Sequence, residues 1–223
     1  MALKLWGRPT SARTQKAILA LAELGMDYEL ILASGTMGTG GHVSKGHAPY
    51  GVVDTDAYRA MNPNGTVPTI DDDGFVLWES NAIVAYLGMA YDPALFYGND
   101  TRTFASASRW MAWENNQLIP PMHALVMQLV RLPEAERDAA ITDAANQKLM
   151  GELKIVEAQL GRTDYIAGDR WTMGDIPLAI NLHRWHLFDM PGPEMPNLAR
   201  YYAQVKARPA FEAIADPAMH LSG

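Results

Sequence analysis

The sequence predicts an α/β domain followed by an all-α domain. Short apolar runs of strand length alternate with helical spacing in residues 1–91, whereas residues 100–223 show helical spacing throughout. Between them, residues 92–99 contain a proline and a glycine with little periodicity, which is typical of a linker. A chain of 223 residues with 48% hydrophobic content is long enough for two modest cores.

The first elements are expected to form a β-α-β unit. Residues 2–6 are a short apolar run, and residues 11–25 have helical spacing that stops at Gly25. Tyr28 to Leu32 is a second strand, and a short helix is expected at residues 54–61.

A β-hairpin and a further helix complete the first domain. The apolar runs at residues 67–70 and 75–78 are separated by an acidic turn that closes at Gly74. Helical spacing then begins at Glu79 and Ser80. The resulting order, β-α-β-α-β-β-α, is that of a thioredoxin-like domain.

The second domain is expected to be built from helices alone. These are predicted at residues 101–132, 133–160, 173–188, 196–206 and 209–215. Thr172 and Asp175 resemble a capping box in which Asp replaces the usual Glu, and Trp171 can pack on Ile176 across it.

The amino-acid composition argues against several classes of function. Eighteen Lys and Arg residues against 25 Asp and Glu give a net charge of -7 without a basic cluster, which argues against nucleic acid and an anionic membrane as partners. Because the chain has no cysteine, a thiol in its chemistry must come from a ligand. The sequence shows no run of about 18 apolar residues and no signal-peptide pattern, so we expect a cytoplasmic location.

The hairpin and the helix start together fit a small zwitterion. Pro68 lies at the start of a hairpin strand, where a cis peptide bond would turn the Val67 backbone outward to pair with a peptide-like ligand. The N–H groups of a helix start attract a carboxylate, while the Ser80 hydroxyl can donate and the Glu79 carboxylate can take an ammonium group. Taken alone, Ser80 and Glu79 are equally typical of a helix cap and first turn.

The segment from Asn62 to Pro68, the Glu79-Ser80 pair and the helix after it resemble the glutathione-binding half of the glutathione S-transferase superfamily. The resemblance implies glutathione as co-substrate and a cis bond before Pro68. It also implies that the Val67 backbone pairs with the cysteinyl part of glutathione and that Glu79 and Ser80 hold its γ-glutamyl end. With the capping motif of the second domain, the resemblance covers nearly the whole chain.

The start of the first helix is where the thiol would be activated. A thiol with a pKa of about 8.5 is mostly protonated at neutral pH, and the thiolate is the nucleophile, so the protein must lower that pKa. We expect Ser11 first and Thr10 second as the catalytic hydroxyls, with Arg13 as a supporting cation.

The family divides into classes that have Tyr, Ser or Cys at this catalytic position, and Trp6 excludes the tyrosine type. In similar bacterial members an Asn stands where Arg13 does. The alternative is that Ser11 is only an N-cap.

The glycine-rich residues 33–56 form a longer segment than the family usually carries. They lack the pattern of a phosphate-binding loop and suit either a flap at the ligand site or a surface loop. The resemblance implies that a basic or amide side chain holds the glycyl carboxylate of glutathione. Thr66 occupies one usual place of that side chain, which leaves His42, Lys45 and His47 as candidates.

The resemblance places a hydrophobic electrophilic small molecule against the all-α domain. On the helix around residues 109–117, Trp110, Met111, Trp113 and Glu114 cannot all face the core, so some are expected at the cleft or at a subunit interface.

The sequence therefore predicts a homodimeric glutathione transferase whose bound thiolate attacks an electrophilic carbon, a peroxide or a disulfide. The competing hypothesis is a non-catalytic protein-interaction module of the same fold, which Arg13 and Thr66 favour. An isomerase that uses glutathione as a cofactor would resemble maleylacetoacetate isomerase, whose Ser-Ser-Cys signature is absent here. His183 and His186 are spaced i, i+3, but no third ligand accompanies them and no metal is expected.

Overall fold

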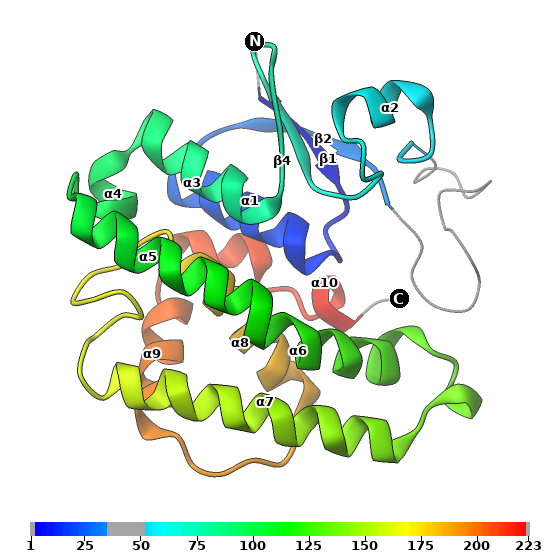
Figure 1. Ribbon diagram of the computed structural model, residues 1–223, viewed down its shortest axis with the longest axis vertical. Coiled ribbons are helices and arrows are strands. Elements are labelled where there is room, and N and C mark those ends of the chain that lie inside the picture. The colour runs from blue at the N-terminus through cyan, green and yellow to red at the C-terminus, as the bar shows by residue number, and fades with distance from the viewer. Residues whose placement is uncertain (1–2, 35–51, 222–223) are drawn as a thin grey trace.

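The computed structural model describes residues 3–34 and 52–221 (Figure 1). The first part of the chain holds a four-stranded sheet in the order β2-β1-β3-β4, in which β1 runs parallel to β2 and the other neighbours are antiparallel. Its strands are β1 (Leu3–Gly7), β2 (Tyr28–Leu32), β3 (Thr69–Asp72) and β4 (Phe75–Trp78).

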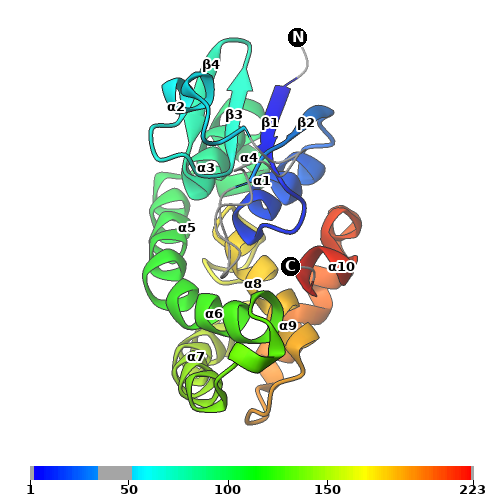
Figure 2. The same cartoon turned by 90° about the vertical axis from the view of Figure 1, so that its right-hand side faces the viewer.

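Helices cover both faces of this sheet. They are α1 (Ala12–Glu23), α2 (Asp56–Met61) and α3 (Ser80–Tyr91). Because strand side chains alternate between faces, Leu3 and Leu5 of β1 enter the core with α1 and α3, whereas Trp6 packs with Tyr58 of α2 on the other face. Figure 2 shows the three helices around the sheet. The element order confirms the predicted α/β thioredoxin-like fold.

The segment expected as a linker contains a short helix, α4 (Pro93–Tyr97). The Asp92 carboxylate accepts a hydrogen bond from the Leu95 N–H at 2.8 Å, and Gly98, with φ of 65°, ends the helix. Phe96 is fully buried. Local capping and this one anchor therefore order a stretch too short to show periodicity.

The rest of the chain is helical, as predicted. Its α-helices are α5 (Thr101–Trp113), α6 (Ile119–Val126), α7 (Ala139–Leu160), α8 (Asp175–Phe188), α9 (Pro196–Lys206) and α10 (Ala218–Leu221). Two π-helical segments, η1 (Glu114–Leu118) and η2 (Met127–Arg131), continue α5 and α6, and two 3₁₀ turns, η3 (Glu134–Glu136) and η4 (Pro209–Ile214), occupy places where α-helix was expected.

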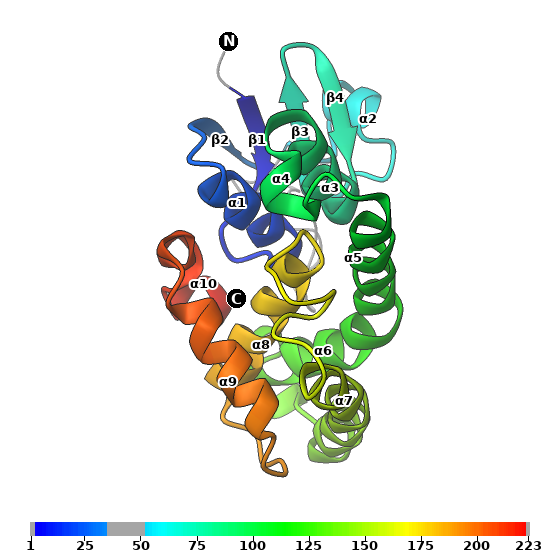
Figure 3. The same ribbon diagram turned by 90° about the vertical axis from the view of Figure 1, so that its left-hand side faces the viewer.

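Helix α8 is the centre of the helical part. All of its residues from Asp175 to Arg184 are buried, and Figure 3 shows it between α6 and α9. The expected capping box forms with one change: the Thr172 N–H donates to Asp175 at 2.8 Å, while the Thr172 hydroxyl accepts from the Gly174 N–H at 3.2 Å. The chain is thereby turned sharply into a helix whose first ten residues are all buried.

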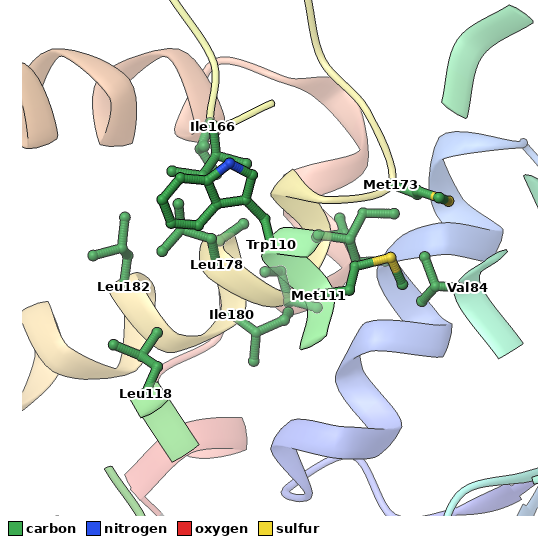
Figure 4. Packing of buried hydrophobic residues seen from close by; sticks show 14 of the residues in the cluster. Val84, Trp110, Met111, Leu118, Ile166, Met173, Leu178, Ile180 and Leu182 are labelled. Carbon is green, nitrogen blue, oxygen red and sulfur yellow. The ribbon is translucent and has the colours of Figure 1, made fainter. Parts of the chain in front are cut away.

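One apolar core runs through both parts of the chain. Figure 4 shows Val84 of α3 beside Met111 of α5 and Met173, which precedes α8. The Met173 N–H also donates to the Phe96 carbonyl at 2.8 Å. The two parts are therefore packed together as one body. No helix within residues 3–34 and 52–221 has the length and apolar character needed to span a membrane.

Candidate active site

The loop from β1 into α1 presents the two expected hydroxyls. A Cβ on Gly7 would lie 2.4 Å from Thr14 Cγ2, so only glycine lets the strand end approach the first turn of α1 this closely. Ser11 is the N-cap, and its Oγ accepts from the Thr14 N–H at 3.4 Å. That contact is long for a hydrogen bond and uses no hydroxyl proton, so Ser11 keeps its donor for a ligand.

Two buried side chains fix the backbone of this loop. The Gln15 amide donates to the Pro9 carbonyl at 2.8 Å and to the Met219 carbonyl at 2.9 Å. Arg184 of α8 donates to the Thr10 carbonyl at 3.3 Å. The loop is therefore held both from within its own domain and from the helical part of the chain.

The bond between Val67 and Pro68 is cis, as predicted. The loop before it is held at the Thr66 carbonyl, which accepts from the Tyr58 hydroxyl at 2.7 Å and from the Asn62 amide at 2.8 Å. Tyr58 and Asn62 are both buried, so the approach to the cis bond is anchored in the fold.

The start of α3 carries an unusual backbone conformation. Glu79 has φ of 73°, a region in which a side chain costs of the order of 1 kcal/mol or more, and its carboxylate caps no N–H of the helix. Ser80, the first residue of α3, is buried, whereas Glu79 is exposed. Strain at an exposed acid beside a helix start is typical of a binding site.

These residues surround one cavity of about 400 Å³, which we call the Ser80 cleft. Its lining includes Arg13, Asn64, Val67, Pro68, Glu79 and Ser80. The structure therefore brings together the four residues expected to contact glutathione, and Arg13 with them.

A second cavity of about 260 Å³, the arginine cavity, adjoins the first, because Arg13, Thr66 and Val67 line both. Thr10 and Ser11 lie on its wall. Its opposite wall includes Ile119, Met122, His123, Val126, Arg131 and Arg184, from α6, η2 and α8.

The residues expected at the cleft or at a subunit interface are absent from this wall. None of Trp110, Met111, Trp113 and Glu114 lines either cavity. Met111 and Glu114 face the core, and Trp110 and the half-buried Trp113 line a separate hollow between α5 and α7. Their helix turns toward α1 and α3, so the next turns along the chain form the cavity wall instead.

A buried ion pair explains that orientation. Lys16 of α1 donates to Glu114 at 2.8 Å, and the two side chains are 1% and 2% exposed. Lys16 also donates to Asn81 of α3 at 3.1 Å, and Asn181 of α8 donates to the other Glu114 oxygen at 2.8 Å. Burial lowers the pKa of Lys16, and the Glu114 carboxylate opposes this shift. The sequence analysis did not identify this network, although two charges at core-facing helix positions were a possible signal.

The two spaced histidines hydrogen-bond within the helical part of the chain; His183 is buried and His186 is exposed. His183 Nδ1 lies 2.7 Å from the Tyr202 hydroxyl, and His186 Nδ1 lies 2.8 Å from the Leu182 carbonyl. In the described part of the chain no three potential metal ligands come together. His42, Lys45 and His47 lie outside the described residues.

Comparison with known proteins places this architecture in a family. The family model "Glutathione S-transferase, N-terminal domain" matches residues 10–90, and the model "Glutathione S-transferase, C-terminal domain" matches residues 118–209. The chain is 34% identical over 215 residues to the glutathione S-transferase GstB of Escherichia coli K12, covering 95% of this chain and 97% of that protein. It is 30% identical over 218 residues to glutathione S-transferase 4 of Zea mays, with 96% and 92% of the two chains covered.

A solved structure agrees with these matches. The theta class glutathione S-transferase of Xanthomonas axonopodis pv. citri, with glutathione bound, superposes with a TM-score of 0.86 at 38% identity, over 96% of this chain and 98% of that one. Both parts of the fold are thereby accounted for, and the chain belongs to the glutathione S-transferase family.

Proposed function

We propose that this glutathione transferase binds its co-substrate extended through the Ser80 cleft. The main support for this binding mode is that Val67, Pro68, Glu79 and Ser80 line one cavity beside the start of α1. The γ-glutamyl carboxylate would lie at the N–H groups and hydroxyl of Ser80, and its ammonium group at Glu79. The cysteinyl backbone would pair with that of Val67, which directs the thiol toward α1.

The first turn of α1 would then stabilise the thiolate. Ser11 is the first candidate donor and Thr10 the second, and Arg13 adds positive charge from a position on both cavities. A pKa shift of about two units corresponds to about 3 kcal/mol of preference for the anion, which a hydroxyl donor and a helix N-terminus together can supply. The proton leaves to solvent, and the thiolate attacks the second substrate from the arginine cavity.

The acceptor is proposed to be an electrophilic carbon of a small molecule. The same thiolate could also reduce a peroxide or attack a disulfide, because those reactions need no further residue at this stage. The non-catalytic module is not favoured, because the curated relatives named above are transferases and the four expected glutathione-binding residues line one cavity.

Titration with glutathione tests the catalytic assignment. We expect bound glutathione to show thiolate ultraviolet absorbance near neutral pH, and Ser11→Ala to raise the pKa of the bound thiol by about one to two units. At neutral pH that change should lower kcat/KM by about 10- to 100-fold. Ser108→Ala, at a half-buried serine of α5 outside both cavities, is the matched control.

The variants also separate the two hydroxyls. If only Thr10→Ala raises the thiol pKa, the catalytic role passes to Thr10, and if neither does, both assignments are wrong. Loss of the Ser11 cap alone should cost about 1 kcal/mol of stability, so urea unfolding of each variant distinguishes capping from catalysis. Absence of glutathione binding at millimolar concentration would contradict the proposed function.

We also propose a homodimer that buries the surface around β4 and α3. Phe75 and Met89 are each 48% exposed and Tyr91 is 45% exposed, a concentration of large apolar side chains that favours a protein contact. Light scattering should give twice the chain mass of 24.5 kDa, and Phe75→Glu should shift the protein to monomer. Ile141→Glu, at a similarly exposed residue of α7, should leave the mass unchanged, and a monomeric parent protein would refute the dimer.

A cytoplasmic location is proposed as well. A chain without cysteine depends on no oxidising compartment for its fold, and its co-substrate must be present in the thiol form.

A further inference from the structure

The arginine cavity is strongly positive in a protein that is negative overall. Arg8, Arg13, Arg131 and Arg184 line it, and no Asp or Glu is among its described lining residues. The whole chain carries a net charge of -7. The cavity therefore has a positive lining although the net charge of the chain is negative, so the positive charge is a local property of this cavity.

Two of these guanidinium groups lack a counter-charge in the described part of the chain. Arg184 is 4% exposed, and its contacts are to neutral oxygens, the Thr10 carbonyl at 3.3 Å and the Gln15 amide at 3.5 Å. The Nε groups of Arg131 and Arg184 are both buried without a hydrogen-bond partner there. A buried charge without a partner is costly, and an anion in the cavity would supply what is missing.

The groups also act on one another. Burial, together with the nearby charges of Arg131 and Arg8, lowers the pKa of Arg184 to about 10. Arg131 and Arg184 remain charged at neutral pH, so the repulsion between these two groups persists when the cavity holds no anion. A bound carboxylate would relieve that repulsion, and guanidinium groups suit carboxylates because they can donate two parallel hydrogen bonds.

The apolar wall of the arginine cavity indicates the chemical character of the rest of the ligand. Ile119, Met122 and Val126 present an apolar surface from α6 to the same cavity. A volume of about 260 Å³ suits a molecule of one ring rather than an extended chain. The cavity thus combines an apolar side with a cationic end.

We propose that the preferred second substrate is an electrophile with an apolar body and an anionic group, and that Arg131 and Arg184 bind that group. This inference rests on the proposed function, because it names the substrate class for the same cleft. In the reaction, the glutathione sulfur forms a bond to the electrophilic carbon while the bond from that carbon to a halide breaks. The halide leaves with the electron pair, and the thiol proton has already passed to solvent.

A matched pair of electrophiles tests the assignment. 4-(Bromomethyl)benzoate and its methyl ester have the same reacting carbon and differ in charge. After subtraction of the uncatalysed rates, we expect kcat/KM for the acid to exceed that for the ester by tenfold or more. Arg131→Gln and Arg184→Gln should each reduce this ratio by about tenfold, whereas Arg162→Gln, at an exposed arginine after α7, should leave it unchanged.

Binding of an unreactive analogue gives an independent result. By calorimetry, 4-methylbenzoate should bind the wild-type protein and its methyl ester should bind at least tenfold more weakly. Arg131 is less buried than Arg184, so Arg131→Gln still decides the matter if Arg184→Gln fails to fold. Equal turnover of acid and ester, or no binding of 4-methylbenzoate at millimolar concentration, would overturn the inference.

Two outcomes separate this inference from the assignments on which it rests. If thiolate absorbance appears but the acid is not preferred, the proposed function stands and the anion site is wrong. If the arginine variants raise KM for glutathione and leave the acid-to-ester ratio intact, these arginines bind a glutathione carboxylate, and the inference is again wrong. If no thiolate forms, the proposed function fails, and the calorimetry alone decides whether the anion site exists.

Discussion

Replacement of Lys16 by methionine is expected to lower the free energy of unfolding by about 3–5 kcal/mol, because it leaves the Glu114 carboxylate buried without its cation. The Glu114 side chain is 2% exposed, so water cannot replace the lost partner without opening the core. Urea unfolding followed by circular dichroism measures the change. Lys148→Met, at an exposed position of α7, should change stability by less than about 0.5 kcal/mol.

A double variant tests whether the stranded charge is the cause. In Lys16→Met with Glu114→Gln, the amide oxygen can still accept from Asn181, and the amide nitrogen can donate to the Asn81 oxygen that Lys16 contacted. We expect the double variant to recover most of the loss, because both charges are gone and the hydrogen bonds are kept. A double variant as unstable as the sum of its parts would contradict this account.

Asp175→Ala is the second substitution with a large expected effect. The carboxylate accepts hydrogen bonds from the N–H groups of Ile166 and Thr172 at 3.0 and 2.8 Å and from the Tyr201 hydroxyl at 3.0 Å. Its loss leaves several buried donors without an acceptor, at about 1–3 kcal/mol each, so the free energy of unfolding should fall by at least about 3 kcal/mol. Asp143→Ala, at an exposed position of α7, is the control for loss of a carboxylate.

The pH dependence of stability provides a second measurement at this site. Burial raises the pKa of Asp175 from 3.8 to about 6, despite the donors that favour the anion. The folded protein therefore binds this proton more tightly than the unfolded chain, and the contribution of Asp175 to stability falls as pH rises from about 4 to about 6. Relative to Asp175→Asn, which cannot ionise, the wild-type protein should gain up to about 3 kcal/mol as pH is lowered through that window. A difference that does not change with pH would show that Asp175 has an ordinary pKa.

The elements that the sequence predicted well are those with strong end signals. The strand Tyr28–Leu32 follows Gly25, the strand Phe75–Trp78 follows Gly74, and the helix Pro196–Lys206 begins at a proline. Helix α4 has five residues and α10 has four, which is less than two turns, so no periodicity could reveal them. The 3₁₀ turn at 209–214 has the same composition as a short α-helix, and its tighter winding depends on packing.

The residues of the candidate site also divide into those that the sequence predicts and those that it does not. Val67, Pro68, Glu79 and Ser80 lie close together in the chain, and hairpin and helix-start geometry is enough to place them around one cavity. Arg184, by contrast, comes from a helix far along the chain that contacts the Thr10 loop only through tertiary packing. Nothing in the local pattern states which face of α8 meets that loop, so its part in the cavity could not be read from one sequence.

Because one apolar core spans both parts of the chain, we do not expect a fragment of the protein to fold on its own. A fragment that ended after α3 would leave Val84 facing water where Met111 and Met173 now cover that side of the interior. It would also strand the Lys16 ammonium without Glu114. The thioredoxin-like half therefore contains most of the lining of the Ser80 cleft but leaves part of its own core and a buried charge uncovered, so we expect stable folding only of the entire polypeptide.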